Sequence, residues 1–375
     1  IEHSQSTISH RMICTQLDND AIVFGAEEYL REALAPYAAE PPPLLAIISS
    51  CAAGLIGDDI EAIARGAGLS CPIAVLDSSG LSGSFADGWD KAACAVLSAF
   101  LPEQRAGQAN AVNLIGVTSA YYNGENDAHE LMRLLALAGY HVNVALGCDM
   151  SAADLSGLTQ AALNIVVHDE LGGGAARLLA ETCGMPCIAP LPPYGRAGTR
   201  KWLVEIGRAL PAPRADAAEE EITRVTREDF LRINECKSLW GELRYETALI
   251  RAPRSTAWGI AQALRTEWAD VCHLAVAADA EGVPTAAPIA DEILGETDAV
   301  RIRELLNGLD GGLLIGSGNE SAHINPRTAA YFPAAYPVQD ALHLSDAPFM
   351  GLRGARHIEE TLWNDRILRR KILLP

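Results

Sequence analysis

A short segment near the N-terminus combines the residue types of a metal or redox site. The segment SSCAAGLIGDDI places Cys51 after an apolar run, with Gly54, Gly57, Asp58 and Asp59 behind it. The run predicts a strand, and the glycines predict a turn into a helix that the two aspartates open. A thiol beside a helix N-terminus lies near partial positive charge, which favours the thiolate that iron needs. Cys51 is therefore a candidate metal ligand, and Gly54 and Gly57 are candidate cofactor-binding residues.

The remaining cysteines show no repeating spacing. The chain has nine cysteines, an odd number scattered through apolar segments, which argues against a secreted disulfide framework. Cys14 is the only other candidate metal ligand near Cys51. Cys183 and Cys187 form a C-x3-C pair, but no second pair follows, so core packing is favoured over a zinc site.

Other polar and glycine-rich motifs give weaker signals. His168-Asp169-Glu170 follows a predicted strand and could transfer protons or bind a substrate, but we favour a solvated turn. For Gly172 to Gly174 we favour a flexible turn over an anion cradle. GRAGTRK (195–201) lacks the spacing of an ATP-binding loop, and GSGNES (316–321) lacks the third glycine of a dinucleotide motif. We expect this chain to bind no nucleotide, and no residue is identified as catalytic.

The elements that would position these residues alternate between strands and helices. The sequence predicts an α/β fold of three Rossmann-like, doubly wound parallel-sheet domains, because short apolar runs alternate with stretches of helical periodicity. The expected strands are 44–50, 72–77, 111–117, 141–146, 163–168, 186–191, 246–252, 271–279 and 312–317. The expected helices are 84–101, 126–138, 151–161, 173–183, 216–240, 255–268, 298–307 and 349–374.

Composition shifts suggest where the domains divide. Residues 211–221, PAPRADAAEEE, contain prolines followed by acidic residues and resemble a linker into a long helix. We expect a first domain at 1–106 together with 345–375. This domain carries the loop at Cys51 that is the candidate metal site. A second domain is expected at 107–212. The long helix and a third domain are expected at 213–344.

Charge and hydropathy exclude several functions. The 375-residue chain has a net charge of −19, which would repel a phosphate backbone, so nucleic acid is not expected as a partner. No apolar run approaches the length of about 20 residues that spans a bilayer, and the first residues lack a signal-peptide pattern. We expect a cytoplasmic protein that does not bind a membrane.

Taken in order, several motifs resemble the nitrogenase component 1-like family. That family includes the nitrogenase molybdenum-iron protein, cofactor-assembly scaffolds and dark-operative tetrapyrrole reductase subunits. Besides the Cys51 loop, the similar segments are CTQLDNDAIVFGAEEYLREAL (14–34), NDAHELMRLLALAGYHVN (126–143), PPYGRAGTRKWLVEIG (192–207) and DAPFMGLRGARHIEETL (346–362). The resemblance covers nearly the whole chain, and their shared order makes it specific.

The resemblance implies an iron–sulfur cluster with Cys51 as a ligand, but this chain departs from the family pattern. IEHSQSTIS has Ser4, Ser6, Thr7 and Ser9 where the family usually brings a Gly-Cys pair, and another expected ligand lies before Ile1. Iron–sulfur clusters generally take about four protein ligands. We therefore expect a cluster shared with a partner subunit. The alternative is that Cys51 is a buried thiol on a conventional turn.

The resemblance also implies a function. We expect a β-type subunit of a two-component, ATP-dependent reductase, paired with a homologous α-type subunit in a heterodimer or heterotetramer. An ATP-hydrolysing iron protein would donate its electrons. The substrate stays open between dinitrogen-like molecules, carbon–sulfur bonds and tetrapyrroles. The alternatives are a non-catalytic cofactor-assembly scaffold, a cluster-less structural partner, or an unrelated periplasmic-type or sugar-nucleotide binding protein.

Overall fold

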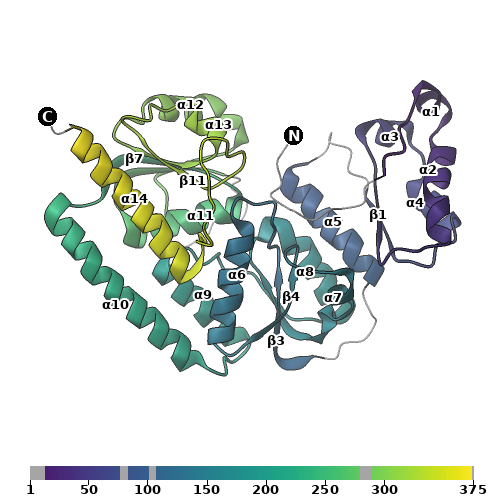
Figure 1. Cartoon of the computed structure of the whole chain (residues 1–375), viewed down its shortest axis with the longest axis horizontal. Helices are drawn as coiled ribbons and strands as arrows, with labels where there is room; N and C mark the ends of the chain where they lie inside the picture. Colours follow the sequence, from purple (N-terminus) through teal and green to yellow (C-terminus); the bar gives the residue numbers. More distant parts are fainter. Residues whose placement is uncertain (1–12, 77–82, 101–106, 279–288, 374–375) are drawn as a thin grey trace. The chain divides into compact units, whose positions relative to one another are not determined.

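The computed structural model describes residues 13–76, 83–100, 107–278 and 289–373. The chain divides into two compact units (Figure 1). Of the described residues, the N-terminal unit comprises 13–76, 83–100, 107–116 and 143–187, and the C-terminal unit comprises 117–142, 188–278 and 289–373. In the described ranges, no helix is both long and apolar enough to cross a bilayer.

Parallel sheets confirm the predicted α/β fold. In the N-terminal unit, β1 (Leu45–Ile48) pairs in parallel with β2 (Ile73–Leu76). A second sheet has the order β4-β3-β5-β6. Its strands are β3 (Gln108–Ile115), β4 (His141–Leu146), β5 (Ala161–Val166) and β6 (Cys187–Ile188). The core of this unit consists of apolar residues from β3, β4 and β5 packed against α5 (Phe85–Phe100) and α8 (Asp169–Cys183).

The third sheet lies in the C-terminal unit and has the strand order β11-β10-β7-β8-β9. Its first strand in the sequence, β7, lies at the centre, and the later strands are added on both sides, as in a doubly wound sheet. The strands are β7 (Arg244–Arg251), β8 (Asp270–Ala277), β9 (Glu292–Leu294), β10 (Leu313–Gly316) and β11 (Ala330–Pro333). The sequence did not predict β9 or β11, because each has only three or four residues and carries little periodicity.

Most predicted helices are present. They include α6 (Gly124–Leu137), α10 (Ala215–Trp240), α11 (Arg254–Ala263), α12 (Ala299–Asn307) and α14 (Gly351–Leu373). The single helix predicted at 151–161 was wrong. Ser151 and Asp154 form the predicted capping box, but α7 (Ala152–Ser156) stops before Gly157, and a 3-10 turn (Leu158–Gln160) follows. Glycine weakens a helix interior, which explains the break.

The predicted turn at Gly172 to Gly174 was also wrong, since these residues lie inside α8. A Cβ on Gly172 would lie 2.9 Å from the backbone nitrogen of Gly116, so glycine lets α8 approach the end of β3. A Cβ on Gly174 would overlap Asp90 of α5, whose carboxylate accepts from the Gly174 and Ala175 N–H groups. The glycines therefore permit close packing rather than flexibility.

Helix α14 is held by carboxylates of α6 in the C-terminal unit. Asp127 Oδ1 accepts from the N–H groups of Phe349 and Met350 at 2.6 and 2.7 Å. Glu130 accepts from the Arg353 N–H group at 3.3 Å. Two of these N–H groups lie just before the first residue of α14 and the third lies in its first turn, so the carboxylates bind donors at the helix start and complement its dipole. Burial raises the pKa of Asp127 to about 7.

The domain boundaries from the sequence remain a prediction. Each of the three sheets lies within one of the predicted ranges. Among the described elements, the main contacts of α14 are with α6, α9 (Gly195–Ala209), α10 and β11, all in the C-terminal unit. The assignment of residues 345–375 to the first domain therefore stays a prediction from the sequence.

Candidate functional site

Cys51 is the first residue of a short helix that directly follows β1. The helix α3 (Cys51–Ile56) begins after Ser50, whose side chain accepts from the Ala53 N–H group at 3.3 Å. Cys51 is exposed. The prediction that a helix begins beside this thiol is confirmed, and the alternative of a buried thiol is wrong.

The predicted turn at Gly54 was wrong. Gly54 lies within α3, and only Gly57 turns the chain, with a left-handed φ of 81° at the C-cap. The Ser50 cap and the Gly57 C-cap enclose one short helix, which explains why the segment does not form a simple turn. The next helix, α4 (Ile60–Gly66), is capped by Asp59, which accepts from the Ala62 N–H group at 2.9 Å.

Asp58 joins the loop to a segment far away in the sequence. Its carboxylate accepts from the Ala26 N–H group at 2.5 Å, and Ala26 follows Gly25 at the end of α1 (Asn19–Phe24). Gly25 has a φ of 103°, and a Cβ there would lie 3.2 Å from Asp58 Oδ1. The structure thus brings the Val-Phe-Gly segment and the Cys51 loop together, a contact that sequence spacing does not reveal.

The described residues do not complete an iron–sulfur site within this chain. Cys14 is exposed and precedes α1 in a segment without regular secondary structure. Among the residues that the structure describes, no three His, Cys, Asp or Glu side chains are arranged to hold a metal ion. Because a cluster takes about four ligands, the donors within the described part of the chain do not fit one by themselves. Cys51 and Cys14 therefore remain predicted ligands.

A hollow of about 630 Å³ adjoins the Cys51 helix in the N-terminal unit. Gly54 and Gly57 line it, together with Asp58 and Asp59. Neither Cys51 nor Cys14 is among its lining residues. The two candidate glycines thus share a surface with the acidic pair, whereas the two candidate thiols lie outside it.

Two other motifs serve the core rather than chemistry. Cys183 and Cys187 pack in the apolar core of the N-terminal unit, and Cys187 Sγ contacts the carbonyl oxygen of Ala176 at 3.3 Å. The prediction of core packing is confirmed. The solvated turn predicted at His168 was wrong, because His168 is only 5% exposed. Its burial lowers the pKa to about 3, so the imidazole is neutral.

A buried ion cluster in the C-terminal unit escaped sequence reasoning. Arg196, at the start of α9, donates to Asp229 of α10 at 2.9 Å and to Glu359 of α14 at 2.7 Å. Its third carboxylate partner is Glu267, at 3.3 Å. Arg356 shares Asp229 at 2.8 Å. Burial raises the pKa of Glu359 to about 7, with Glu267 and Asp229 reinforcing the rise and Arg196 opposing it.

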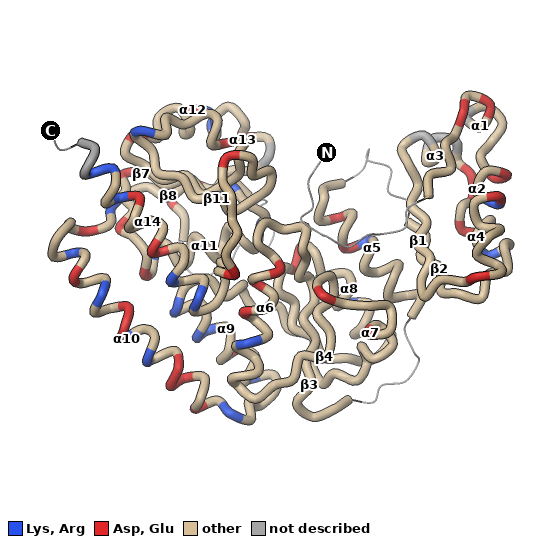
Figure 2. The backbone as a smooth tube through the Cα atoms, viewed as in Figure 1, with Lys and Arg blue, Asp and Glu red and all other residues tan. Residues whose placement is uncertain are grey.

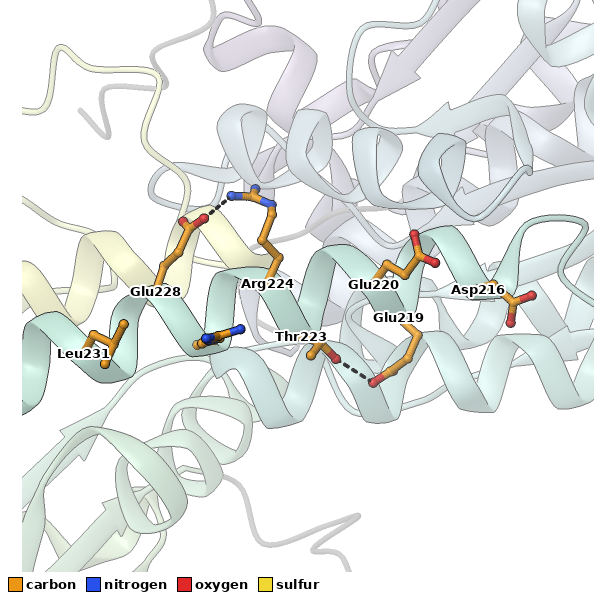
Figure 3. Close-up of a pocket in the computed structure, with 8 residues that line it drawn as sticks. Asp216, Glu219, Glu220, Thr223, Arg224, Glu228 and Leu231 are labelled. Atoms are coloured by element: carbon orange, nitrogen blue, oxygen red, sulfur yellow. Dashed lines mark hydrogen bonds and ion pairs between the residues drawn. The ribbon is translucent and has the colours of Figure 1, made fainter.

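The outward face of α10 forms a second, shallow hollow (Figure 3). Its lining consists of charged residues, Thr223 and Leu231, and contains no thiol or imidazole. Arg224 pairs along the helix with Glu221 and Glu228 at 2.9 and 2.6 Å. These pairs describe a solvated helix surface, and nothing in this lining offers redox chemistry.

Comparison with known proteins decides the family. The family model for nitrogenase component 1 type oxidoreductase matches residues 1–365. The chain belongs to this family. The resemblance found in the sequence is thereby confirmed, including its extent over nearly the whole chain.

Relatives within the family are reductase subunits. The B subunit of the light-independent protochlorophyllide reductase of Prosthecochloris aestuarii (strain DSM 271 / SK 413) is 29% identical over 174 residues, which cover 44% of this chain and 31% of that protein. The corresponding B subunit of Methylobacterium sp. (strain 4-46) is 26% identical over 348 residues, covering 90% of this chain and 67% of that protein. In several of these B subunits, including the first of the two named here, the matched part is about a third of the relative's length.

Solved structures confirm the fold. The structure "Nitrogenase Cp1 at pH 6.5" matches with a TM-score of 0.77 over 96% of this chain and 83% of that one, at 15% identity. A second structure, "Nitrogenase Cp1 at pH 5", matches with a TM-score of 0.73 at 20% identity. At these identities the likeness concerns the fold alone.

Proposed function

We propose that this chain is a β-type subunit of a two-component, ATP-dependent, nitrogenase-like reductase. It pairs with a homologous α-type subunit and receives electrons from a separate ATP-hydrolysing iron protein. The observation that carries the proposal is the family match over residues 1–365. Its relatives are named as B subunits of a reductase, which supports the β-type assignment.

The cofactor we propose is an iron–sulfur cluster shared with the partner subunit, with Cys51 as the ligand from this chain and Cys14 as a second candidate. The exposed position of Cys51 at the start of α3 supports a shared site, since a ligand to an interfacial cluster must be reachable from the other chain. Gly54 and Gly57 are proposed to shape the surface beside it. The chain is proposed to work in the cytoplasm.

The substrate class we propose is a tetrapyrrole. The relatives are named for the reduction of protochlorophyllide, and this supports a tetrapyrrole over dinitrogen-like molecules and carbon–sulfur bonds. The protein's part in such a reaction is to position the redox centres and to exclude water.

A second candidate function is a cofactor-assembly scaffold or a cluster-less structural partner. One observation favours it: the described residues contain no group of three metal-ligating side chains. The scaffold would form the same complex with the homologous chain, and that complex would show no turnover.

Reconstitution separates these functions. The chain, co-purified with its homologous partner without oxygen, is mixed with the iron protein, ATP and protochlorophyllide, and reduction is followed by absorbance. The reductase assignment requires turnover that depends on both ATP and the iron protein. A stable complex that takes up cluster or cofactor but gives no turnover with any of the three substrate classes would support the scaffold instead.

A further inference from the structure

The described residues leave apolar side chains of the two-stranded sheet beside Cys51 exposed to solvent. Parallel sheets normally have both faces buried, and a lone pair of strands is marginally stable at best. Both strands are wholly apolar, LAII and IAVL. Nevertheless Ile48 is 67% exposed, and Ile73 and Val75 are only half-buried. The sheet therefore presents apolar surface that the described parts of this chain do not bury.

The hollow described above opens on this sheet. Ile73 and Val75 line it from β2, and small residues line it from the helices on either side. On α5 these are Ala95, Ser98 and Ala99. Protein interiors pack densely and rarely leave spaces much larger than a water molecule. The hollow of about 630 Å³ has a mixed lining, apolar at β2 and charged at α4, and the described residues leave it open to atoms of another molecule.

The charge around the hollow indicates which kind of polypeptide segment can bind there. Asp58, Asp59 and Glu61 line the hollow with a single cation, Arg65, which pairs with Glu61 along α4. The larger segment 13–76 contains nine acidic residues and two basic ones. Acidic residues outnumber basic ones in α2 (Glu27–Leu34), and the charged residue of α1 is also acidic (Figure 2). The occupant must therefore combine apolar residues for the lining with Lys or Arg for this acidic surround.

The position of Cys51 indicates which molecule supplies that segment. An iron–sulfur cluster takes about four ligands, and the described residues provide no group of three. Under the proposed function, Cys51 binds a cluster shared with the partner subunit, and the partner then lies against α3. The same helix contributes Ala53 and Gly54 to the hollow. On α1, which contacts α3, Phe24 adds further apolar surface and is 85% exposed.

We propose that a segment of the homologous partner subunit, apolar at its tip and flanked by Lys or Arg, fills the hollow between α4 and α5. This inference rests on the proposed function, because it takes the homologous subunit as the partner. It adds the surface and the chemistry of docking. The segment covers Ile73 and Val75, and its basic residues face Asp58, Asp59 and Glu61.

The first test introduces a large side chain into the hollow. Ser98→Trp is compared with Ser238→Trp, a matched control on α10, because both serines are exposed and donate to the carbonyl oxygen four residues earlier at 2.8 Å. We expect Ser98→Trp to weaken binding of the homologous partner by about tenfold or more, since a central interface position is blocked. Ser238→Trp should leave the Kd unchanged. Thermal unfolding of each variant checks that it folds.

The second test changes charge without adding bulk. Glu61→Lys alone should raise the Kd for the partner and reduce the dependence of binding on salt. The double variant Glu61→Lys with Arg65→Glu keeps the pair along α4 and the net charge, so it should restore much of the affinity. This pair of variants decides the question even if Ser98→Trp does not fold.

The outcomes separate the docking surface from the proposed function. If the unmodified chain forms no complex with the homologous subunit, both the proposed function and this inference fail. If the complex forms and neither Ser98→Trp nor Glu61→Lys weakens it, the hollow is not the docking site and the proposed function stands. Selective loss with both variants, and none with Ser238→Trp, supports the inference.

Discussion

Neutralising Glu359 should remove a pH dependence that the buried cluster imposes on stability. Glu359 is 3% exposed and lies among Arg196, Asp229 and Glu267. Its pKa is raised from 4.5 to about 7. The folded chain thus holds this proton more tightly than the unfolded chain does. The stabilisation is complete below the unfolded pKa and is lost as the pH rises through the folded pKa.

The magnitude follows from the size of the pKa rise. One pKa unit corresponds to about 1.4 kcal/mol, so titration of Glu359 should lower the free energy of unfolding by about 2 to 3 kcal/mol between pH 5 and pH 8. Gln resembles the protonated acid and does not titrate. Glu359→Gln should match the unmodified chain near pH 5 and exceed its stability at pH 8 by that amount.

Urea denaturation at pH 5, 6, 7 and 8 measures this difference. Glu360→Gln is the matched control, because Glu360 is the next residue of α14 and is exposed. The control should follow the pH dependence of the unmodified chain. Burial also raises the pKa of Asp127 to about 7. Titration of Asp127 therefore lowers the free energy of unfolding as the pH rises, in the unmodified chain and in both variants. If Glu359→Gln and the unmodified chain change equally between pH 5 and pH 8, the reasoning about the buried cluster is refuted.

Two further predictions concern packing and charge. Arg196→Met should lower the free energy of unfolding by about 3 to 5 kcal/mol at neutral pH, because it leaves buried carboxylates without their cation; urea denaturation measures this, and a loss below about 1 kcal/mol would show that the cluster rearranges. Gly172→Ala should cost about 1 to 3 kcal/mol, because its methyl group would meet the Gly116 backbone at 2.9 Å. Gly184→Ala, where a Cβ meets nothing within 4 Å but φ is 61°, separates this close approach from backbone strain; equal thermal shifts in the two variants would contradict the packing argument.

Long, regular elements were the predictable part of the fold. The run LNIVVH and the 26-residue helix α10 carry their periodicity in the sequence, and the structure confirms both as β5 and α10. The strands β9 and β11 were missed because three or four residues hold too little pattern. The helix α3 was read as a turn because Gly54 suppresses the helical signal, whereas the Ser50 cap and the position after β1 outweigh it.

The sequence predicted the motif of the site, but not which residues from distant parts of the chain lie beside it. The Cys51 loop stands out because its glycines, aspartates and thiol are adjacent in sequence. The bond from Asp58 to Ala26 spans 32 residues, and Arg196 meets Glu359 across 163 residues. Such partners depend on how helices pack, which one sequence does not reveal. The available sign of the ion cluster in the sequence was Arg196, the first arginine of GRAGTRKWLVEIG. It lies among buried positions of α9.

The central claim is that this chain contributes Cys51 to a cluster shared with a partner subunit. The most direct measurement is the iron and acid-labile sulfide content, with the EPR spectrum, of the complex co-purified with the homologous subunit without oxygen. Cys51→Ala is compared with Cys272→Ala, which removes an exposed thiol from the C-terminal unit. We expect cluster iron, sulfide and the EPR signal to be lost with Cys51→Ala and kept with Cys272→Ala. Unchanged iron, sulfide and EPR signal in the Cys51→Ala complex would contradict the account.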